Sequence, residues 1–190
     1  MRILSPDEFN KEKSELIDEI ISGAVFIYPT DTIYGIGCNA TNSKAVKKIR
    51  KIKNRAANPF SVIAPSKEWI SENCTISKEA EKWIKKLPGT YTFILKLKNN
   101  RAVSKEVNPD IDTLGVRIPD HWISELASEA NTPIVTTSVN KSSEDFMTSL
   151  NDLDASIKSS VDFIIYEGKK KGKPSTIVNL TEEIKIIKRK

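Results

Sequence analysis

Two kinds of apolar segment alternate along this chain of 190 residues, and that alternation constrains its fold more than any other feature. One kind is short and rich in β-branched and aromatic residues, as in "AVFIYPT" at 24–30 and "PIVTTS" at 133–138, which is typical of buried strands. The other repeats apolar residues at helical spacing, as Val46, Ile49 and Ile52 do. Strands that alternate with helices predict an α/β fold with helices packed on a sheet.

The predicted elements follow one another without a linker, a repeat or a low-complexity segment. A capping box of Ser5 and Glu8, with Pro6 at the first helical position, predicts a helix to about Ser22. The other predicted helices cover 43–54, 76–87, 122–130 and 149–158, and the predicted strands cover 24–30, 60–66, 91–98, 115–119, 133–138, 161–168, 175–180 and 184–190. We therefore expect a single domain over residues 1–190.

Few residues are available for metal or nucleophilic chemistry. Cys38 and Cys74 stand at no metal-ligand spacing and are expected to be unpaired thiols, and His121 is the single histidine. We therefore expect neither a structural zinc nor a Ser/His/Asp triad. No window approaches the roughly 18 apolar residues of a membrane span, and the start lacks a secretory signal, so we expect a cytoplasmic protein without membrane contact.

Positive charge is concentrated in two places, within a net charge of +5. One cluster follows the predicted amphipathic helix from Lys44 to Arg55, and the other is the lysine-rich segment 169–173. Most of these side chains are expected to be solvated, although both clusters could also bind a polyanion. The place of each cation in the fold is therefore needed to tell a ligand-binding side chain from a solvated one.

Two motifs suggest chemistry that their surroundings do not support. "GIGCNA" at 35–40 fits the dinucleotide pattern G-x-G-x-x-[GA], but a proline-containing turn precedes it and no acid lies about 20 residues on to hold a ribose. Ser138 follows a predicted strand but lacks the glycines of a G-x-S-x-G elbow. We therefore expect no dinucleotide loop, and we expect Ser138 to form hydrogen bonds rather than to act as a nucleophile.

Polar residues gather where predicted strands begin or end. They occur in "YPTDTIYG" at 28–35, "GVRIP" at 115–119, "TTSVN" at 136–140 and "PSTIV" at 174–178. Lys53 and Arg55 end the basic helix, and taken alone they would only cap its last carbonyls. Because ligands bind at the strand ends of open α/β sheets, these groups together predict one cavity for a phosphate-bearing substrate.

Six motifs in a fixed order cover nearly the whole chain. They are "AVFIYPTDTIYGIGCNA" at 24–40, "KNRAANPF" at 53–60, "PGTYTFIL" at 88–95, "GVRIPDH" at 115–121, "PIVTTSVN" at 133–140 and "PSTIVNL" at 174–180. This ordered set resembles the YrdC/Sua5 family, which includes the threonylcarbamoyl-AMP synthases. The K-x-R and S-x-N signatures of that family correspond to Lys53, Arg55, Ser138 and Asn140.

The resemblance implies a fold and a reaction. The fold would be a single YrdC-like domain, with a twisted, mostly mixed open sheet and a basic substrate cavity. The protein would be a nucleotidyltransferase that condenses L-threonine, bicarbonate and ATP into threonylcarbamoyl-adenylate and pyrophosphate. A second enzyme complex would then transfer the threonylcarbamoyl group to tRNA. ATP would be a substrate, and Mg²⁺ would accompany it, although no carboxylate pair is reserved for the metal.

The resemblance also implies roles for particular residues. Lys53 and Arg55 would be the catalytic cations that neutralise the ATP phosphates. The threonine pocket would be shaped by Thr30, Tyr34 and Arg117, with Arg117 pairing the carboxylate of the amino acid. ATP would also be held by Asn58, Thr113, Ser138, Asn140 and Ser175.

The sequence departs from the family's pattern at a few positions. In "SVNKSS", Val139 stands where the family commonly has alanine and Ser143 where it has glycine, which bears on ATP binding. Ala56 replaces a common proline, and Ile63 stands where some members have histidine. The length resembles the short, single-domain form of the family.

Other functions remain open at this stage. One is a paralogue of the same fold, such as the YciO branch or the carbamoyl-adenylate-forming domain of hydrogenase maturation proteins. The segment "PGTYTFILK" suits the YciO branch as well, but the intact S-x-N signature favours the synthase. Another is a non-catalytic RNA-binding module, in which the basic clusters would make weak contacts to tRNA or double-stranded RNA.

Overall fold

The computed structural model describes residues 1–142 and 144–188. Its strands are β1 (Arg2–Leu4), β2 (Phe26–Tyr28), β3 (Gly35–Gly37), β4 (Ser61–Ile63), β5 (Cys74–Thr75), β6 (Tyr91–Leu97), β7 (Thr113–Arg117), β8 (Ile134–Ser138), β9 (Phe163–Ile165), β10 (Thr176–Asn179) and β11 (Lys185–Ile187). Its helices are α1 (Pro6–Lys11), α2 (Lys13–Ser22), α3 (Ser43–Ile52), α4 (Lys67–Asn73), α5 (Lys78–Ile84), α6 (Ser124–Glu129) and α7 (Ala155–Ser160), with a 3-10 turn at Leu150–Asp152.

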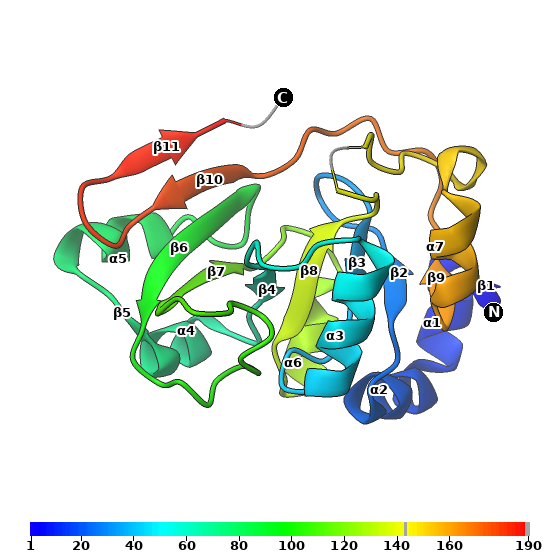
Figure 1. Ribbon diagram of the computed structural model, residues 1–190, viewed down its shortest axis with the longest axis horizontal. Helices are drawn as coiled ribbons and strands as arrows, with labels where there is room; N and C mark the ends of the chain where they lie inside the picture. Colours follow the sequence, from blue (N-terminus) through cyan, green and yellow to red (C-terminus); the bar gives the residue numbers. More distant parts are fainter. Residues whose placement is uncertain (143, 189–190) are drawn as a thin grey trace.

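All described strands join one sheet, with helices on both of its faces (Figure 1). The strand order is β1-β9-β2-β3-β8-β4-β7-β6-β10-β11, and β5 pairs with β6. The sheet is mixed: β8, for example, pairs antiparallel with both β3 and β4, whereas β4 pairs parallel with β7 and β6 pairs parallel with β10. The predicted α/β fold with a mixed sheet is confirmed.

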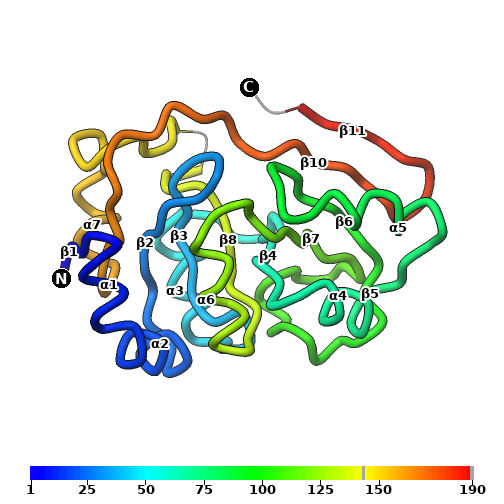
Figure 2. The backbone as a smooth tube through the Cα atoms, turned by 180° about the vertical axis from the view of Figure 1, so that it is seen from behind, coloured from blue at the N-terminus to red at the C-terminus, as the bar shows by residue number. Residues whose placement is uncertain are grey.

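Strand β2 shows that the sheet separates two cores. Ile27 packs in a core that includes residues of α3, whereas Phe26 and Tyr28 pack in a second core that includes residues of α2 and α6. Successive side chains of a strand point to opposite faces, so a strand buried on both sides reads as one continuous apolar run. Figures 1 and 2 show α3 and α6 on opposite faces of the sheet.

Several boundaries differ from the prediction. The helix predicted from Pro6 to Ser22 is two helices that meet at Glu12, although the predicted capping box is present. The helix predicted over 149–158 is a 3-10 turn followed by α7. Elements β1, β3, α4 and β5 were not predicted, because each is too short to show a clear periodicity.

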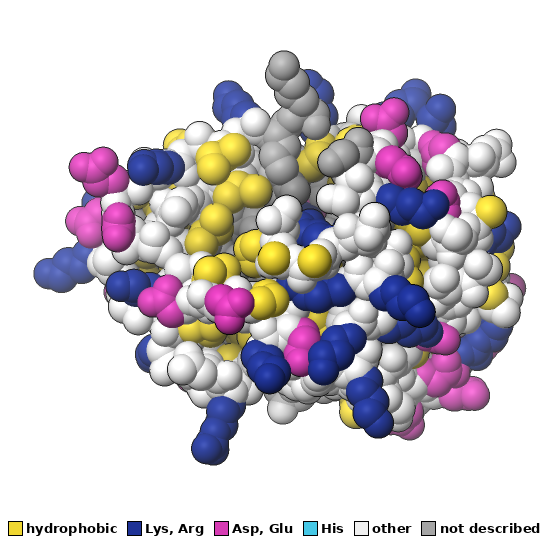
Figure 3. Space-filling model, viewed as in Figure 1, with side chains coloured by type: hydrophobic (Ala, Val, Ile, Leu, Met, Phe, Trp, Pro, Cys, Tyr) yellow, Lys and Arg dark blue, Asp and Glu magenta, His cyan; other side chains and the backbone are white. Residues whose placement is uncertain are grey.

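Helix α3 is the predicted basic amphipathic helix. The side chain of Asn42 caps its first turn by accepting a hydrogen bond from the backbone N–H of Ala45 at 3.1 Å, and Val46 and Ile49 are buried beneath it. Two of its lysines form ion pairs with other elements, Lys47 with Glu106 at 3.2 Å and Lys48 with Asp162 at 2.8 Å. Lysine and arginine side chains gather over this part of the surface (Figure 3). Much of the cluster is therefore a solvated face, as predicted.

Further expectations concern cysteine pairing, metal-ligand clusters and membrane-spanning helices. Within residues 1–142 and 144–188, Cys38 and Cys74 are free thiols, and no three His, Cys, Asp or Glu side chains lie together as a metal site. No helix of the described chain combines the length and apolarity needed to cross a membrane.

Candidate functional site

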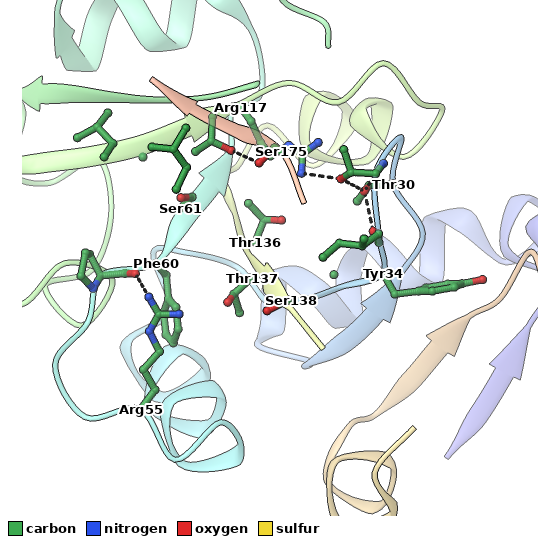
Figure 4. A pocket seen from close by; sticks show the side chains of 18 of the residues that line it. Thr30, Tyr34, Arg55, Phe60, Ser61, Arg117, Thr136, Thr137, Ser138 and Ser175 are labelled. Carbon is green, nitrogen blue, oxygen red and sulfur yellow. Dashed lines mark hydrogen bonds between the residues drawn. The ribbon is translucent and has the colours of Figure 1, made fainter. Parts of the chain in front are cut away.

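A cavity of about 240 Å³ lies in the middle of the sheet, where the polar strand ends meet. Its lining comes from the β2–β3 loop, the segment after α3, and strands β4, β6, β7, β8 and β10 (Figure 4). The lining residues are Thr30, Thr32, Ile33, Tyr34, Gly35, Arg55, Pro59, Phe60, Ser61, Thr92, Ile94, Thr113, Gly115, Arg117, Thr136, Thr137, Ser138, Ser175 and Ile177. Within the described chain, the charged side chains among them are two arginines.

Most of the predicted site residues line this one cavity. They are Thr30, Tyr34, Arg55, Thr113, Arg117, Ser138 and Ser175. The other three, Lys53, Asn58 and Asn140, do not line it but form hydrogen bonds with Arg55 or Ser138, which do. The fold therefore brings together residues that are far apart in the sequence, while their individual roles stay predictions.

The two arginines lie at opposite ends of the cavity, with Thr136 between them and Thr137 and Ser138 nearer the Arg55 end (Figure 4). Arg55 donates from Nε to the carbonyl of Asn58 at 3.2 Å and from Nη2 to that of Pro59 at 2.7 Å. Burial, and next the charge of Arg50, lowers its pKa from 12.5. A guanidinium held in this way offers a fixed two-pronged donor for phosphate oxygens.

Arg50 holds the turn that carries Arg55. Its guanidinium donates to the carbonyls of Arg55 and Ala56, each at 3.1 Å, and to that of Asn58 at 3.2 Å. It also lies over the ring of Phe60, 4.5 Å from the centroid. One cation of the basic cluster is therefore a structural clamp, a role that the sequence did not reveal.

Lys53 is buried, with 2% of its surface exposed. Its ammonium donates to the carbonyl of Ser138 at 2.5 Å, to the carbonyl of Asn140 at 2.7 Å and to the side-chain oxygen of Asn140 at 2.9 Å. Three acceptors match the three hydrogens of an ammonium. In this structure, therefore, the K-x-R lysine fixes the shape of the S-x-N turn.

The burial of Lys53 leads to a pH-dependent prediction. Burial, and next the charge of Arg55, lowers its pKa from 10.5 to about 7. Between these values the unfolded chain binds more protons than the folded one, so the free energy of unfolding is expected to rise with pH across that interval. Lys53→Met cannot titrate and should lack this rise. Urea melts of both proteins at about pH 6.5, 8 and 9.5 measure it, and a pH-independent difference would contradict the prediction.

The S-x-N turn is held by its own side chains as well. The hydroxyl of Ser138 donates to the side-chain oxygen of Asn140 at 2.6 Å, and the Asn140 amide donates to the carbonyl of Glu144 at 2.6 Å. Val139, which stands where the family commonly has alanine, is buried in the core, so its larger side chain packs away from the cavity. Ser143, the other departure, lies outside the described residues.

Arg117 lies at the other end of the cavity as one partner of a buried ion pair. Its Nη2 lies 2.5 Å from Oδ1 of Asp31, and the two side chains are 6% and 7% exposed. Burial lowers the pKa of Arg117, and the Asp31 carboxylate opposes this shift. Nη1 donates to the hydroxyl of Thr32 at 3.4 Å, while Nε has no hydrogen-bond partner within the described chain. Nε is itself fully buried, so it is an unsatisfied donor inside the protein rather than one that faces the cavity.

Thr30 and Tyr34 belong to the loop between β2 and β3. The hydroxyl of Thr30 donates to the carbonyl of Ile33 at 2.7 Å and accepts from the N–H of Thr32 at 3.1 Å. The hydroxyl of Tyr34 donates to the carbonyl of Gly168 at 2.6 Å, and burial raises its pKa to about 12, so it remains protonated. The loop therefore fixes the Thr30 hydroxyl on the side of Arg117, whereas the Tyr34 hydroxyl is turned away from the cavity toward Gly168 (Figure 4).

Hydroxyl groups make up most of the remaining polar lining. Five of these lining residues were not predicted as site residues from the sequence: Thr32, Ser61, Thr92, Thr136 and Thr137. Thr92, for example, lies 2.7 Å from the Ser175 hydroxyl. Threonine is common in strands, so its presence there gives no functional signal. Asp31 was also missed, although it stands between Thr30 and Thr32 in a motif that was recognised.

The comparisons with known proteins agree on one family. Residues 18–190 match the Sua5/YciO/YrdC family, which is described as "Telomere recombination". The chain is 40% identical to the "Putative threonylcarbamoyl-AMP synthase" of Methanocaldococcus jannaschii, over 97% of this chain and 87% of that protein.

Solved structures show the same fold. P. abyssi Sua5 complexed with L-threonine is 29% identical, with a TM-score of 0.85 over 96% of this chain and 54% of that one. This chain thus spans little more than half of the Sua5 chain. E. coli YciO, at 24% identity, matches with a TM-score of 0.85 over 99% of this chain and 94% of that one, and shows the fold alone. The chain belongs to the Sua5/YciO/YrdC family.

Proposed function

We propose that this protein is a threonylcarbamoyl-AMP synthase, a nucleotidyltransferase that forms L-threonylcarbamoyladenylate from L-threonine, bicarbonate and ATP. The observation that carries the proposal is the cavity with an arginine at each end and hydroxyl groups between them. The substrates carry anionic groups at two separated points, the carboxylate of threonine and the phosphates of ATP. The name of the Methanocaldococcus jannaschii relative and the threonine complex of P. abyssi Sua5 support the same reaction.

The proposed reaction needs no protein nucleophile. The amine of threonine and bicarbonate give a carbamate with loss of water. A carbamate oxygen then forms a bond to the α-phosphorus of ATP, while the bond from that phosphorus to the oxygen of pyrophosphate breaks. Catalysis then rests on alignment of two anions and on stabilisation of the charge on the phosphates.

Different residues would bind the threonine carboxylate and the ATP phosphates. Arg117, which lines the cavity together with Thr30 and Tyr34, would pair the threonine carboxylate. Arg55 would bind the ATP phosphates, with Lys53 beside it as the second cation or as the support of the S-x-N turn. The other ATP contacts would come from Asn58, Thr113, Ser138, Asn140 and Ser175.

Mg²⁺ is expected with ATP, but the cavity lining offers few ligands for the metal. No Asp or Glu is among the described residues that line the cavity, and nearby Asp31 is already paired with Arg117. The metal would therefore be held mainly by the triphosphate itself. The product would pass to a tRNA threonylcarbamoyl transferase complex, and the basic face of α3 would at most add weak RNA contacts.

The test is pyrophosphate release from ATP. We expect release to require both L-threonine and bicarbonate, because the attacking group is their carbamate, and we expect mass spectrometry to find threonylcarbamoyl-adenylate. D-threonine and omission of bicarbonate are the controls. Turnover of ATP that ignores threonine would reject the synthase and favour a YciO-type paralogue. Salt-sensitive RNA binding without any turnover would favour an RNA-binding module.

A further inference from the structure

The chain between β9 and β10 crosses from one half of the sheet to the other and lies against the β2–β3 loop (Figures 1 and 2). We call residues 167–173 of this chain the crossover segment. Its closest approach is at Gly172, where an added Cβ would lie 1.9 Å from the carbonyl oxygen of Thr32. Only a residue without a side chain fits there, so the segment and the loop are packed backbone against backbone.

Lys170 ties the crossover segment to the same loop. Its ammonium donates to the carbonyl of Thr30 at 2.9 Å and pairs with the carboxylate of Glu167, and its side chain is 19% exposed. Its backbone N–H donates to the carbonyl of Thr148 at 2.9 Å. A charged donor to a carbonyl is among the stronger hydrogen bonds of a protein, so this contact restrains Thr30, near the start of the loop.

Glu167 extends the restraint to the segment that follows Arg117. Its carboxylate accepts from the Nε1 of Trp122 at 3.1 Å and lies 2.9 Å from the Nε2 of His121. Its backbone N–H donates to the hydroxyl of Tyr34 at 3.2 Å. Glu167 and Lys170 thus connect the β2–β3 loop to the segment that follows Arg117.

The neighbouring lysines differ from Lys170. Lys169, Lys171 and Lys173 are exposed, whereas Lys170 is partly buried. A lysine-rich segment that served only as a solvated surface would not need one member to reach a carbonyl behind the cavity lining. The four lysines cannot be told apart from the sequence, but the contacts of Lys170 distinguish it from its neighbours.

We propose that Lys170, supported by Glu167, is a positioning residue that holds the Thr30–Tyr34 loop in the shape needed by the amino-acid substrate. This role rests on the proposed function, since it concerns the threonine end of the same cavity. It predicts a selective effect: loss of the Lys170 contact should weaken the use of threonine while the distant ATP end near Arg55 is unaffected.

The experiment compares Lys170→Ala with Lys171→Ala, a matched neighbour whose side chain is exposed. For Lys170→Ala we expect the KM for threonine to rise about tenfold, with the KM for ATP and kcat at saturating threonine within about twofold of wild type. Lys171→Ala should match wild type in all three. Lys170→Arg keeps a charged donor and should restore part of the loss. Gly172→Ala should raise the same KM independently, because its methyl group collides with the loop.

Calorimetric titration with L-threonine alone gives a readout that needs no turnover, and Lys170→Ala should raise the Kd in parallel with the KM. If Lys170→Ala behaves like Lys171→Ala while wild type binds and uses threonine, the positioning role is wrong and the proposed function stands. Equal rises in the KM values for threonine and ATP would also overturn it, because they indicate a general loosening of the fold. If wild type neither binds nor uses threonine, the proposed function fails and the positioning role falls with it.

Discussion

Replacement of Arg117 by alanine is expected to abolish threonine-dependent turnover and to lower the free energy of unfolding by about 3 to 5 kcal/mol. The loss of stability is expected because the Asp31 carboxylate, the ion-pair partner of Arg117, remains in place. Asp31 is 7% exposed, and without Arg117 its carboxylate would be left buried beside no cation. Urea melts and the pyrophosphate assay measure the two effects.

A double variant separates stability from function. Asp31→Asn combined with Arg117→Met removes both charges and keeps much of the side-chain volume. Its free energy of unfolding should recover most of what Arg117→Ala loses, because no buried charge is left unpaired. Its turnover should not recover, because the donor for the threonine carboxylate is still missing. Recovery of both would show that Arg117 serves the fold alone.

Arg55→Ala and Arg55→Lys are both expected to lower kcat/KM about a hundred- to a thousandfold, the usual cost of removing one preorganised donor from developing charge. Lysine should not substitute, because it cannot reproduce the two-pronged geometry of the guanidinium. The fold should survive, since the carbonyls of Asn58 and Pro59 that Arg55 binds belong to exposed residues and can bond to water once the guanidinium is removed.

Lys51→Ser is the matched control for Arg55, since Lys51 is an exposed cation near the end of the same helix. It should retain nearly full turnover. Circular dichroism and thermal melts accompany each assay. A variant Arg55→Ala that melts far lower but turns over nearly normally would identify Arg55 as a structural residue, and a large loss in Lys51→Ser would assign function to the face of α3.

The fold was predictable where local pattern and burial agree. Helix α3 has a clear apolar stripe and a capping residue, and strand β8 is a compact β-branched run, so both lie within two residues of their predicted bounds. Strand β3 was not predictable, because its sequence, Gly-Ile-Gly, has low strand propensity. Its place is fixed by packing: a Cβ on Gly37 would lie 2.2 Å from the carbonyl oxygen of Val135, so only glycine lets β3 approach β8.

The site was predictable as a set of residues but not as a geometry. The ordered motifs identified residues that line the cavity or contact its lining, although several lining hydroxyl groups were missed. They could not show that Lys53 is buried, because a lysine at a helix end is ordinarily solvated and its acceptors come from Ser138 and Asn140, far along the chain. Lys170 was hidden for the same reason: its acceptor, the carbonyl of Thr30, is specified by tertiary contact alone.

The parallel pairing of β10 with β6, which sets Thr176 beside Tyr91, bears on how the protein is synthesised. A chain emerging from the ribosome can assemble its earlier strands first, but it cannot complete the cavity before this late strand is made, because Ser175 reaches Thr92 only once β10 is in place. A ligand that binds in the completed cavity would therefore stabilise finished molecules and not chains that still lack β10.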